Sequence, residues 1–129
     1  MRIGEVIATT GLSARMVRHY EKIGLLPGPS RLGNLYRDYG PADVARLRFI
    51  VHARDAGLST DETRVLLQLW DDRARSGTDV GAAVRARIEE LEDRRRLLED
   101  IVVALQNLAQ ACDDGSRPNL PTFPAGKRD

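Results

Sequence analysis

Cysteine is nearly absent from the 129-residue sequence, because Cys112 is the only one. A single cysteine cannot form a disulfide within the chain, although its thiol could still react, bind metal or link two chains. No apolar stretch approaches the roughly 20 residues that cross a bilayer. The opening MRIGEV has neither the basic nor the apolar region of a signal peptide. We therefore expect a cytoplasmic protein with no membrane partner.

Aromatic residues make up only 5% of the sequence, whereas hydrophobic residues make up 42% and charged residues 30%. This balance is typical of a folded, helix-rich chain with an aliphatic core. The length fits one domain, or a small domain with an appendage. The sequence shows no neighbouring Cys and His pair, no Gly-rich phosphate loop and no clustered metal ligands. We therefore expect no enzyme activity, no cofactor and no metal site.

Positive charge is concentrated in the first half of the chain. Residues 1–57 hold nine Arg or Lys and five Asp or Glu, and nine minus five gives +4. The remaining residues hold eleven against fourteen, which gives −3. A basic first half favours a surface that faces a polyanion, although an ordinary solvated surface is the alternative.

The first 23 residues have the pattern of two short helices joined by a tight turn. The first helix ends at Gly11, and Ser13 is a good N-cap for the second, which we expect from Ala14 to about Ile23. Leu12 can pack against Val17 as a hydrophobic staple. Two helices that meet through a short turn containing glycine predict a helix-turn-helix.

One face of the second helix is basic. Its members follow the i, i+3, i+4, i+7 spacing and are Arg15, Arg18, His19 and Lys22. The inward positions are Met16, Val17, Tyr20 and Ile23. A helix fits the DNA major groove, where Arg donates to guanine and Lys and His contact phosphate or base edges. A solvated helix face is the alternative, and this helix alone does not decide between them.

The segment that follows the second helix predicts a β-hairpin wing. Gly33-Asn34 is a type II′ turn signal between two short extended arms. The arms place guanidinium and phenol donors for phosphate beside the helix, on Arg31, Tyr36 and Arg37. Tyr36 could instead be a core aromatic that closes the wing, which is the interpretation that we favour for Tyr39.

Residues 41–72 predict two connector helices. Pro41 suits the first position of one helix, and Gly57 stops it. Its apolar residues recur at helical spacing and are Val44, Leu47, Ile50 and Val51. Ser59 and Glu62 form a capping box for the next helix. On that helix Leu66, Leu69 and Trp70 share one side, and we expect Trp70 to pack between the head and the long helix that follows, with a place in a ligand pocket as the alternative.

The segment from Asp79 to Cys112 contains no proline and one glycine. As a helix it would be about 51 Å long, too long for the compact head to bury. Its apolar residues alternate in steps of three and four, the pattern of a coiled coil. The predicted dimerisation seam comprises Val84, Ile88, Leu91, Leu98, Val102 and Leu105, with Arg95, Ala109 and Cys112 at further positions. Parallel and antiparallel pairs both fit this seam, and Arg95 could select the register.

Three segments, IGEVIATTGLSARMVRHYEKIGLL, RLGNLYRDYG and ARLRFIVHARDAGLSTDET, resemble the mercury-resistance regulator (MerR) family of bacterial transcription regulators. The resemblance spans residues 1 to about 112. It implies a mainly α fold, with a winged helix-turn-helix head at 1–40, connector helices at 41–72, an antiparallel coiled-coil dimerisation helix at 79–112 and a loop or tail at 113–129. It also implies DNA contacts by Arg15, Arg18, Arg31, Tyr36, Arg37 and Arg54.

The resemblance implies a homodimer that binds promoter DNA sequence-specifically and regulates transcription. It would bend and untwist the promoter in response to an effector, so that RNA polymerase acts on the same DNA. The alternative is a metal- or small-molecule-binding coiled-coil protein with a degenerate DNA-binding head. These two functions differ in whether the basic helix binds DNA.

The copper-efflux branch of that family is most similar in layout, because its metal loop follows the dimer helix and begins with a cysteine, as at Cys112. The second cysteine of that loop would fall at Leu120, so the two-thiolate site is absent. Three interpretations of Cys112 stay open. The first is that it is only the last buried residue of the seam. The second is that its thiol senses a redox change or an electrophile, which would then be the effector. The third is that it is the remnant of a metal site.

Overall fold

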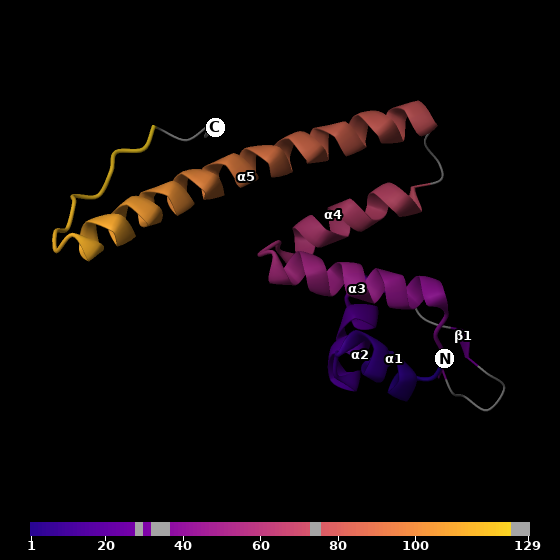
Figure 1. Ribbon diagram of the computed structural model, residues 1–129. Helices are drawn as coiled ribbons and strands as arrows, with labels where there is room; N and C mark the ends of the chain where they lie inside the picture. The colour runs from indigo at the N-terminus through magenta and orange to yellow at the C-terminus, as the bar shows by residue number, and fades with distance from the viewer. Residues whose placement is uncertain (28–29, 32–36, 73–75, 125–129) are drawn as a thin grey trace. The chain divides into compact units, whose positions relative to one another are not determined.

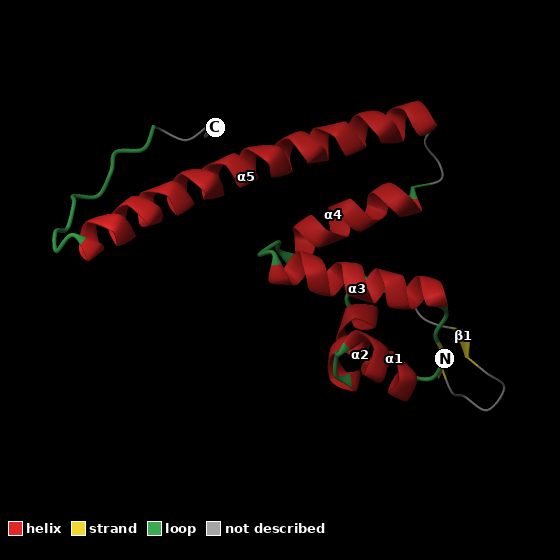
Figure 2. Cartoon of the chain, in the orientation of Figure 1, coloured by secondary structure: helices red, strands yellow, loops and turns green. Residues whose placement is uncertain are grey.

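The computed structural model describes residues 1–27, 30–31, 37–72 and 76–124, with Ser30, Arg31 and Arg37 described by their backbone alone. This part of the chain is mainly helical, with five helices and one pair of very short strands (Figures 1 and 2). It divides into two compact units, Met1–Ser76 and Gly77–Asp129.

The first two helices form the predicted helix-turn-helix. Helix α1 spans Ile3–Thr10 and ends at Gly11, whose φ of 75° is left-handed and suits glycine. Helix α2 spans Ala14–Lys22, and the Oγ atom of Ser13 accepts a hydrogen bond from the amide of Met16 at 3.1 Å. Both helix limits and the Ser13 cap are confirmed.

Two short strands lie where the wing is predicted. Strand β1, Ser30–Arg31, pairs antiparallel with strand β2, Arg37–Asp38. The register places Ser30 opposite Asp38 and Arg31 opposite Arg37. The turn at Gly33-Asn34 and Tyr36 lie outside the described residues, so the hairpin wing as a whole stays a prediction.

The two connector helices begin at the predicted caps. Helix α3 spans Pro41–Asp55 with proline in its first turn, and helix α4 spans Thr60–Asp71. The capping box of α4 is complete, because the Glu62 amide donates to Ser59 Oγ at 3.1 Å and the Ser59 amide donates to Glu62 Oε1 at 2.9 Å. The cap signals therefore predict both starting points.

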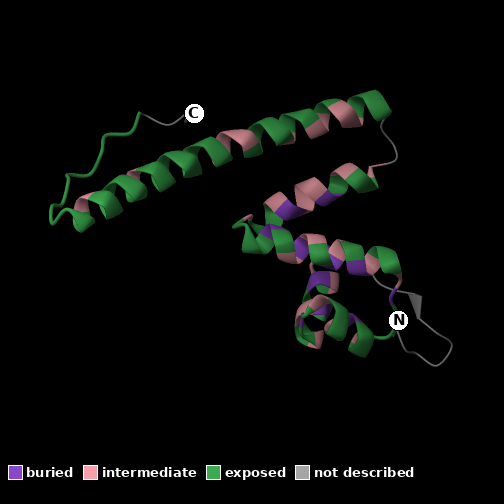
Figure 3. Cartoon of the chain, viewed as in Figure 1, coloured by how far each residue is buried: buried purple, intermediate pink, exposed green. Residues whose placement is uncertain are grey.

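The core of the first unit lies among α1, α2, α3 and α4. Helix α1 packs on α2 and α3, and α3 packs on α4. The buried residues of these helices and of the segments between them form one apolar cluster, and buried positions are purple in Figure 3. They include Val6, Leu12, Val17, Tyr20, Leu25, Leu26, Tyr39, Leu47, Ile50 and Leu67. Leu12 and Val17 are both in this cluster, as the predicted staple requires.

The buried face of α4 differs from the prediction. Thr63 and Leu67 are buried, whereas Leu66 and Leu69 are half-buried. Trp70 lies outside the core of the first unit, with 67% of its surface exposed, and its predicted packing against the dimerisation helix stays a prediction. Residues 63 and 67 are four apart and lie one above the other on the helix, so they form the stripe that faces α3. Trp70 instead meets the ring of Phe49 edge-on, at 5.3 Å between ring centroids.

The second unit is dominated by one long helix. Helix α5 spans Gly77–Asp113, and its 37 residues extend about 55 Å. None of its residues is buried in the single chain, as Figure 3 shows. Residues 116–124 form neither helix nor strand, as the prolines of this tail predict. Within the part of the chain that is described, no helix has the length and hydropathy of a membrane span.

Candidate nucleic-acid interface

Helix α2 separates its basic and apolar residues on opposite faces. Every member of the predicted basic face is exposed, namely Arg15, Arg18, His19 and Lys22. On the other face Val17 and Tyr20 are buried, and Met16 and Ile23 are half-buried. Among the described residues, no hydrogen bond or ion pair engages the side chains of Arg15, Arg18 or Lys22. These three cations are therefore available to an external anion.

The buried side of α2 is held in place by α3 and by the end of the wing segment. The Tyr20 hydroxyl accepts a hydrogen bond from Arg54 Nη1 at 3.3 Å. The Tyr39 hydroxyl donates to Glu21 Oε1 at 2.6 Å. Tyr39 is only 1% exposed, which confirms its interpretation as a core aromatic. These two hydrogen bonds attach the face of α2 opposite the basic residues to the rest of the first unit.

Arg54 lies at the C-terminal end of α3, next to α2. Its side chain is 49% exposed and contacts both the Tyr20 hydroxyl and the Asp55 carboxylate. The guanidinium thus reaches α2 while half of the side chain faces solvent. The side chains of Arg31 and Arg37 and all of Tyr36 lie outside the described residues.

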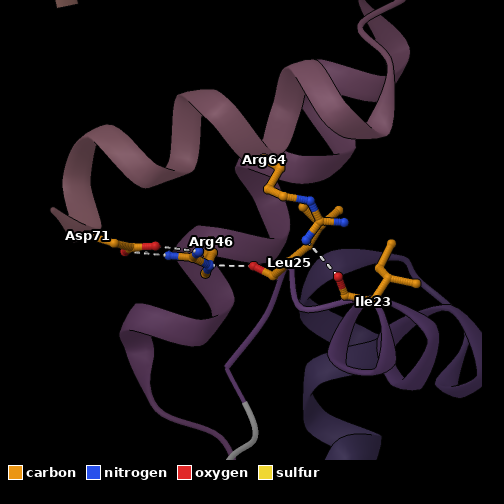
Figure 4. Close-up of polar contacts among 5 residues, drawn as sticks. All are labelled: Ile23, Leu25, Arg46, Arg64 and Asp71. Atoms are coloured by element: carbon orange, nitrogen blue, oxygen red, sulfur yellow. Dashed lines mark hydrogen bonds and ion pairs between the residues drawn. The ribbon is translucent and has the colours of Figure 1, made fainter. Parts of the chain in front are cut away.

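Two arginines that carry no motif in the sequence, Arg46 and Arg64, donate hydrogen bonds to the turn that follows α2. The amides of Leu25 and Leu26 both donate to the Tyr20 carbonyl, at 2.9 and 3.1 Å. Beyond this turn, Arg46 donates to the Leu25 carbonyl and Arg64 donates to the Ile23 carbonyl, each at 2.6 Å (Figure 4). These partners are 21 and 41 residues apart in sequence, so no local pattern could have revealed them.

The predicted dimerisation seam lies along α5 and is uncovered in the single chain. Its exposed fractions run from 38% at Leu91 to 58% at Leu105, with Ile88, Leu98 and Val102 between these values. Val84 is half-buried. A helix that exposes an apolar stripe over several turns needs a partner surface, since large apolar patches are rare on monomers.

Cys112 lies at the end of α5 and is exposed. Within the described ranges of the chain, no group of three or more His, Cys, Asp or Glu side chains could hold a metal ion. A copper(I) site of the copper-efflux type needs two thiolates, and the sequence has only one cysteine. The residues present therefore do not fit such a copper centre.

Two family models match the chain and together cover most of it. The model described as MerR HTH family regulatory protein matches residues 1–70. The model described as MerR, DNA binding matches residues 44–108. The first covers the helix-turn-helix and the connector helices, and the second includes most of α5.

Known proteins show the same similarity over nearly the whole chain. The HTH-type transcriptional regulator HmrR of Sinorhizobium medicae (strain WSM419) is 42% identical over 121 residues, which are 94% of this chain and 82% of that protein. Heavy metal-dependent transcription regulator 2 of Rhizobium meliloti (strain 1021) is 41% identical over the same shares. The crystal structure of HiNmlR, a MerR family regulator lacking the sensor domain, bound to promoter DNA, has the same fold. Its TM-score is 0.63 at 18% identity, over 90% of this chain and 91% of that chain.

Proposed function

Because the chain belongs to the MerR family of helix-turn-helix regulatory proteins, we propose that it acts as an antiparallel homodimer that places α2 of each copy in a major groove of promoter DNA. The protein is a DNA-binding transcription regulator and not an enzyme. The observation that carries the proposed geometry is the basic face of α2, whose arginines and lysine are exposed and have no partner in the described part of the chain.

The basic face of α2 supplies the groups that a major groove requires. Arginine can donate two hydrogen bonds to the O6 and N7 atoms of guanine, and lysine and histidine can contact base edges or phosphates. We assign groove contacts to Arg15, Arg18, His19 and Lys22. The exposed half of the Arg54 side chain supports a phosphate contact beside α2. Arg31, Tyr36 and Arg37 are assigned phosphate contacts from the sequence alone.

The seam on α5 supports a second copy of the chain as its partner. Pairing Val84, Ile88, Leu91, Leu98, Val102 and Leu105 with the same residues would bury a stripe that the single chain leaves exposed. A two-fold symmetric dimer reads a pseudo-palindromic operator, because each copy faces one half-site. Bending and untwisting such a site between promoter elements would change how RNA polymerase engages them.

The test of this proposal is the substitution Arg18→Ala. We expect operator affinity to fall by about 1 to 3 kcal/mol, which is about 5- to 150-fold, because the lost guanidinium contact is not replaced. The mass of the dimer should not change. The measurement is a fluorescence-anisotropy titration of labelled operator, with the operator first obtained by sequencing genomic fragments that the purified protein retains.

Arg117→Ala is the matched control, because it removes the same charge from the exposed tail. This control should bind the operator within about twofold of the wild type. An Arg18→Ala protein that binds like the control would remove Arg18 from the interface. Such a result would favour the alternative of a coiled-coil binding protein with a degenerate head.

The effector is proposed to be something other than copper bound by paired thiolates. High-affinity copper(I) sites need at least two soft ligands, and this chain has one cysteine. Two copies could each contribute Cys112, but an antiparallel α5 pair centred on Leu98 would hold these thiols about 40 Å apart. We therefore expect copper(I) and silver(I) to bind only weakly, and Cys112→Ser to retain operator binding.

Competition with a chelator of known copper(I) affinity measures this expectation directly. Wild type and Cys112→Ser should lose copper to the chelator equally. A tight, stoichiometric copper complex that disappears in Cys112→Ser would contradict the prediction and would require a second ligand elsewhere in the dimer.

A further inference from the structure

Two carbonyl groups in the turn that follows α2 accept hydrogen bonds from arginines of the connector helices. Backbone carbonyls that are shielded from water need a hydrogen-bond donor. Here the Ile23 carbonyl accepts from Arg64 Nη1 and the Leu25 carbonyl accepts from Arg46 Nε, both at 2.6 Å (Figure 4). Arg64 comes from α4 and Arg46 from α3. The turn is thus tied to both connector helices.

The Arg46 guanidinium also binds the last residue of α4. Its two Nη atoms donate to the two carboxylate oxygens of Asp71, at 2.9 and 2.8 Å. The guanidinium is planar and rigid, so its Nε and Nη donors move as one body. The Arg46 side chain is only 17% exposed, which limits its freedom to turn toward solvent. A displacement of Asp71 must therefore also displace the donor of the Leu25 carbonyl.

The second arginine acts on the same turn from another point of α4. Gly24 has a left-handed φ of 81°, and Arg64 Nη1 lies 3.4 Å from the place where a Cβ atom on Gly24 would be. The absence of a side chain at Gly24 thus lets the guanidinium lie against the backbone. Arg64 thus connects α4 directly to the turn after α2, and Arg46 connects α4 to the same turn through Asp71.

We propose that Arg46, Arg64 and Asp71 are positioning residues that couple α4 to the orientation of the recognition helix α2, and so set operator affinity without contacting DNA. This inference rests on the proposed role of α2 in the major groove. Helix α4 is the last element before α5 in the chain. A change of state that pulls on the C-terminal end of α4 would therefore reach α2 through these hydrogen bonds.

The first test is Asp71→Asn, which removes the charge and one of the two acceptor oxygens that hold Arg46. We expect affinity for the operator to fall about tenfold, because Arg46 no longer has one fixed position. Affinity for unrelated DNA and the salt dependence of binding should stay within about twofold, because the phosphate contacts are unchanged in number. A merely structural ion pair would change thermal stability and would leave the ratio of specific to non-specific affinity unchanged.

Glu90→Gln is the matched control, because it also replaces a carboxylate whose two oxygens both accept from one arginine, here the half-buried Arg87 on α5. It should bind operator and unrelated DNA like the wild type. The second test is Arg64→Met, which keeps an unbranched side chain over Gly24 and removes the donor to the Ile23 carbonyl. It should lower operator affinity in the same selective way, and it keeps the proposal testable if Asp71→Asn does not fold.

A charge exchange, Arg46→Asp with Asp71→Arg, separates the ion pair between positions 46 and 71 from the hydrogen bond to the Leu25 carbonyl. It can restore an ion pair between α3 and α4, but an aspartate at position 46 cannot donate to the Leu25 carbonyl. We expect the melting temperature of the double variant to return toward that of the wild type, and its operator affinity to stay as low as that of Asp71→Asn. Full recovery of affinity would overturn the proposal, since the pair would then act only as a clamp between α3 and α4.

The variants distinguish this inference from the proposed function. If Arg18→Ala loses operator affinity while Asp71→Asn and Arg64→Met bind like the wild type, the coupling is wrong and the groove contact of α2 stands. If Arg18→Ala also binds like the wild type, the assignment of α2 to the groove is wrong, and the coupling falls with it.

Discussion

The substitution Leu98→Asp should abolish the dimer and operator binding with it. Leu98 lies halfway between Val84 and Cys112 along the seam of α5, so an antiparallel pair brings both copies of residue 98 near its centre. Two introduced carboxylates would then face each other in an apolar interface. Burying a charge without a partner costs on the order of several kcal/mol, and the repulsion of like charges adds to that cost.

Sedimentation velocity measures the loss of the dimer, and the same samples titrated with operator measure the loss of binding. The matched control is Leu120→Asp, because Leu120 is 89% exposed on the tail and should accept a charge without effect. A Leu98→Asp protein that sediments as a dimer would show that residue 98 does not lie in the interface, and the register assigned to α5 would be wrong.

The substitution Leu47→Ala should lower the free energy of unfolding of the first unit, Met1–Ser76, by about 2 to 5 kcal/mol. Leu47 is completely buried in the core of the first unit, and its removal leaves a cavity that the surrounding helices cannot fully close. For a unit of this size, each kcal/mol lowers the melting temperature by about 4 to 8 °C. Operator binding should be retained at low temperature and lost on warming, since the recognition helix depends on the folded head.

Thermal unfolding followed by circular dichroism gives the change in stability, with Leu120→Ala as the control for the loss of an exposed leucine. The control should differ from the wild type by less than about 0.5 kcal/mol. A Leu47→Ala protein that melts with the control would mean that α3 does not pack its Leu47 face into the core.

The helix limits of the head could be predicted from the sequence because the signals that set them are local. Ser13 accepts from an amide three residues later, and Ser59 and Glu62 satisfy each other across the same interval. Gly11 ends α1 because a left-handed residue is needed there. Each of these contacts joins residues close together in the chain, so it forms without contacts between distant parts of the sequence.

The buried face of α4 could not be predicted, because this helix is apolar on more than one side. Leu66, Leu67 and Leu69 are all suitable core residues, and only the position of α3 selects Leu67. The Arg46 link was hidden for a related reason. Its two partners, Leu25 and Asp71, lie in the turn after α2 and at the end of α4, far from Arg46 in the sequence, and an arginine on a helix is usually read as an ordinary surface charge. Long-range geometry, rather than residue type, decides both cases.

The edge-on contact of Trp70 with Phe49 gives the protein a built-in optical reporter. Trp70 is the only tryptophan in the sequence, and its indole is largely exposed one residue before Asp71. The intrinsic emission excited in the indole band therefore arises from a single place, at the end of α4. A shift in its wavelength or its quenching by acrylamide would register a change in the surroundings of that helix end, without any label attached to the chain.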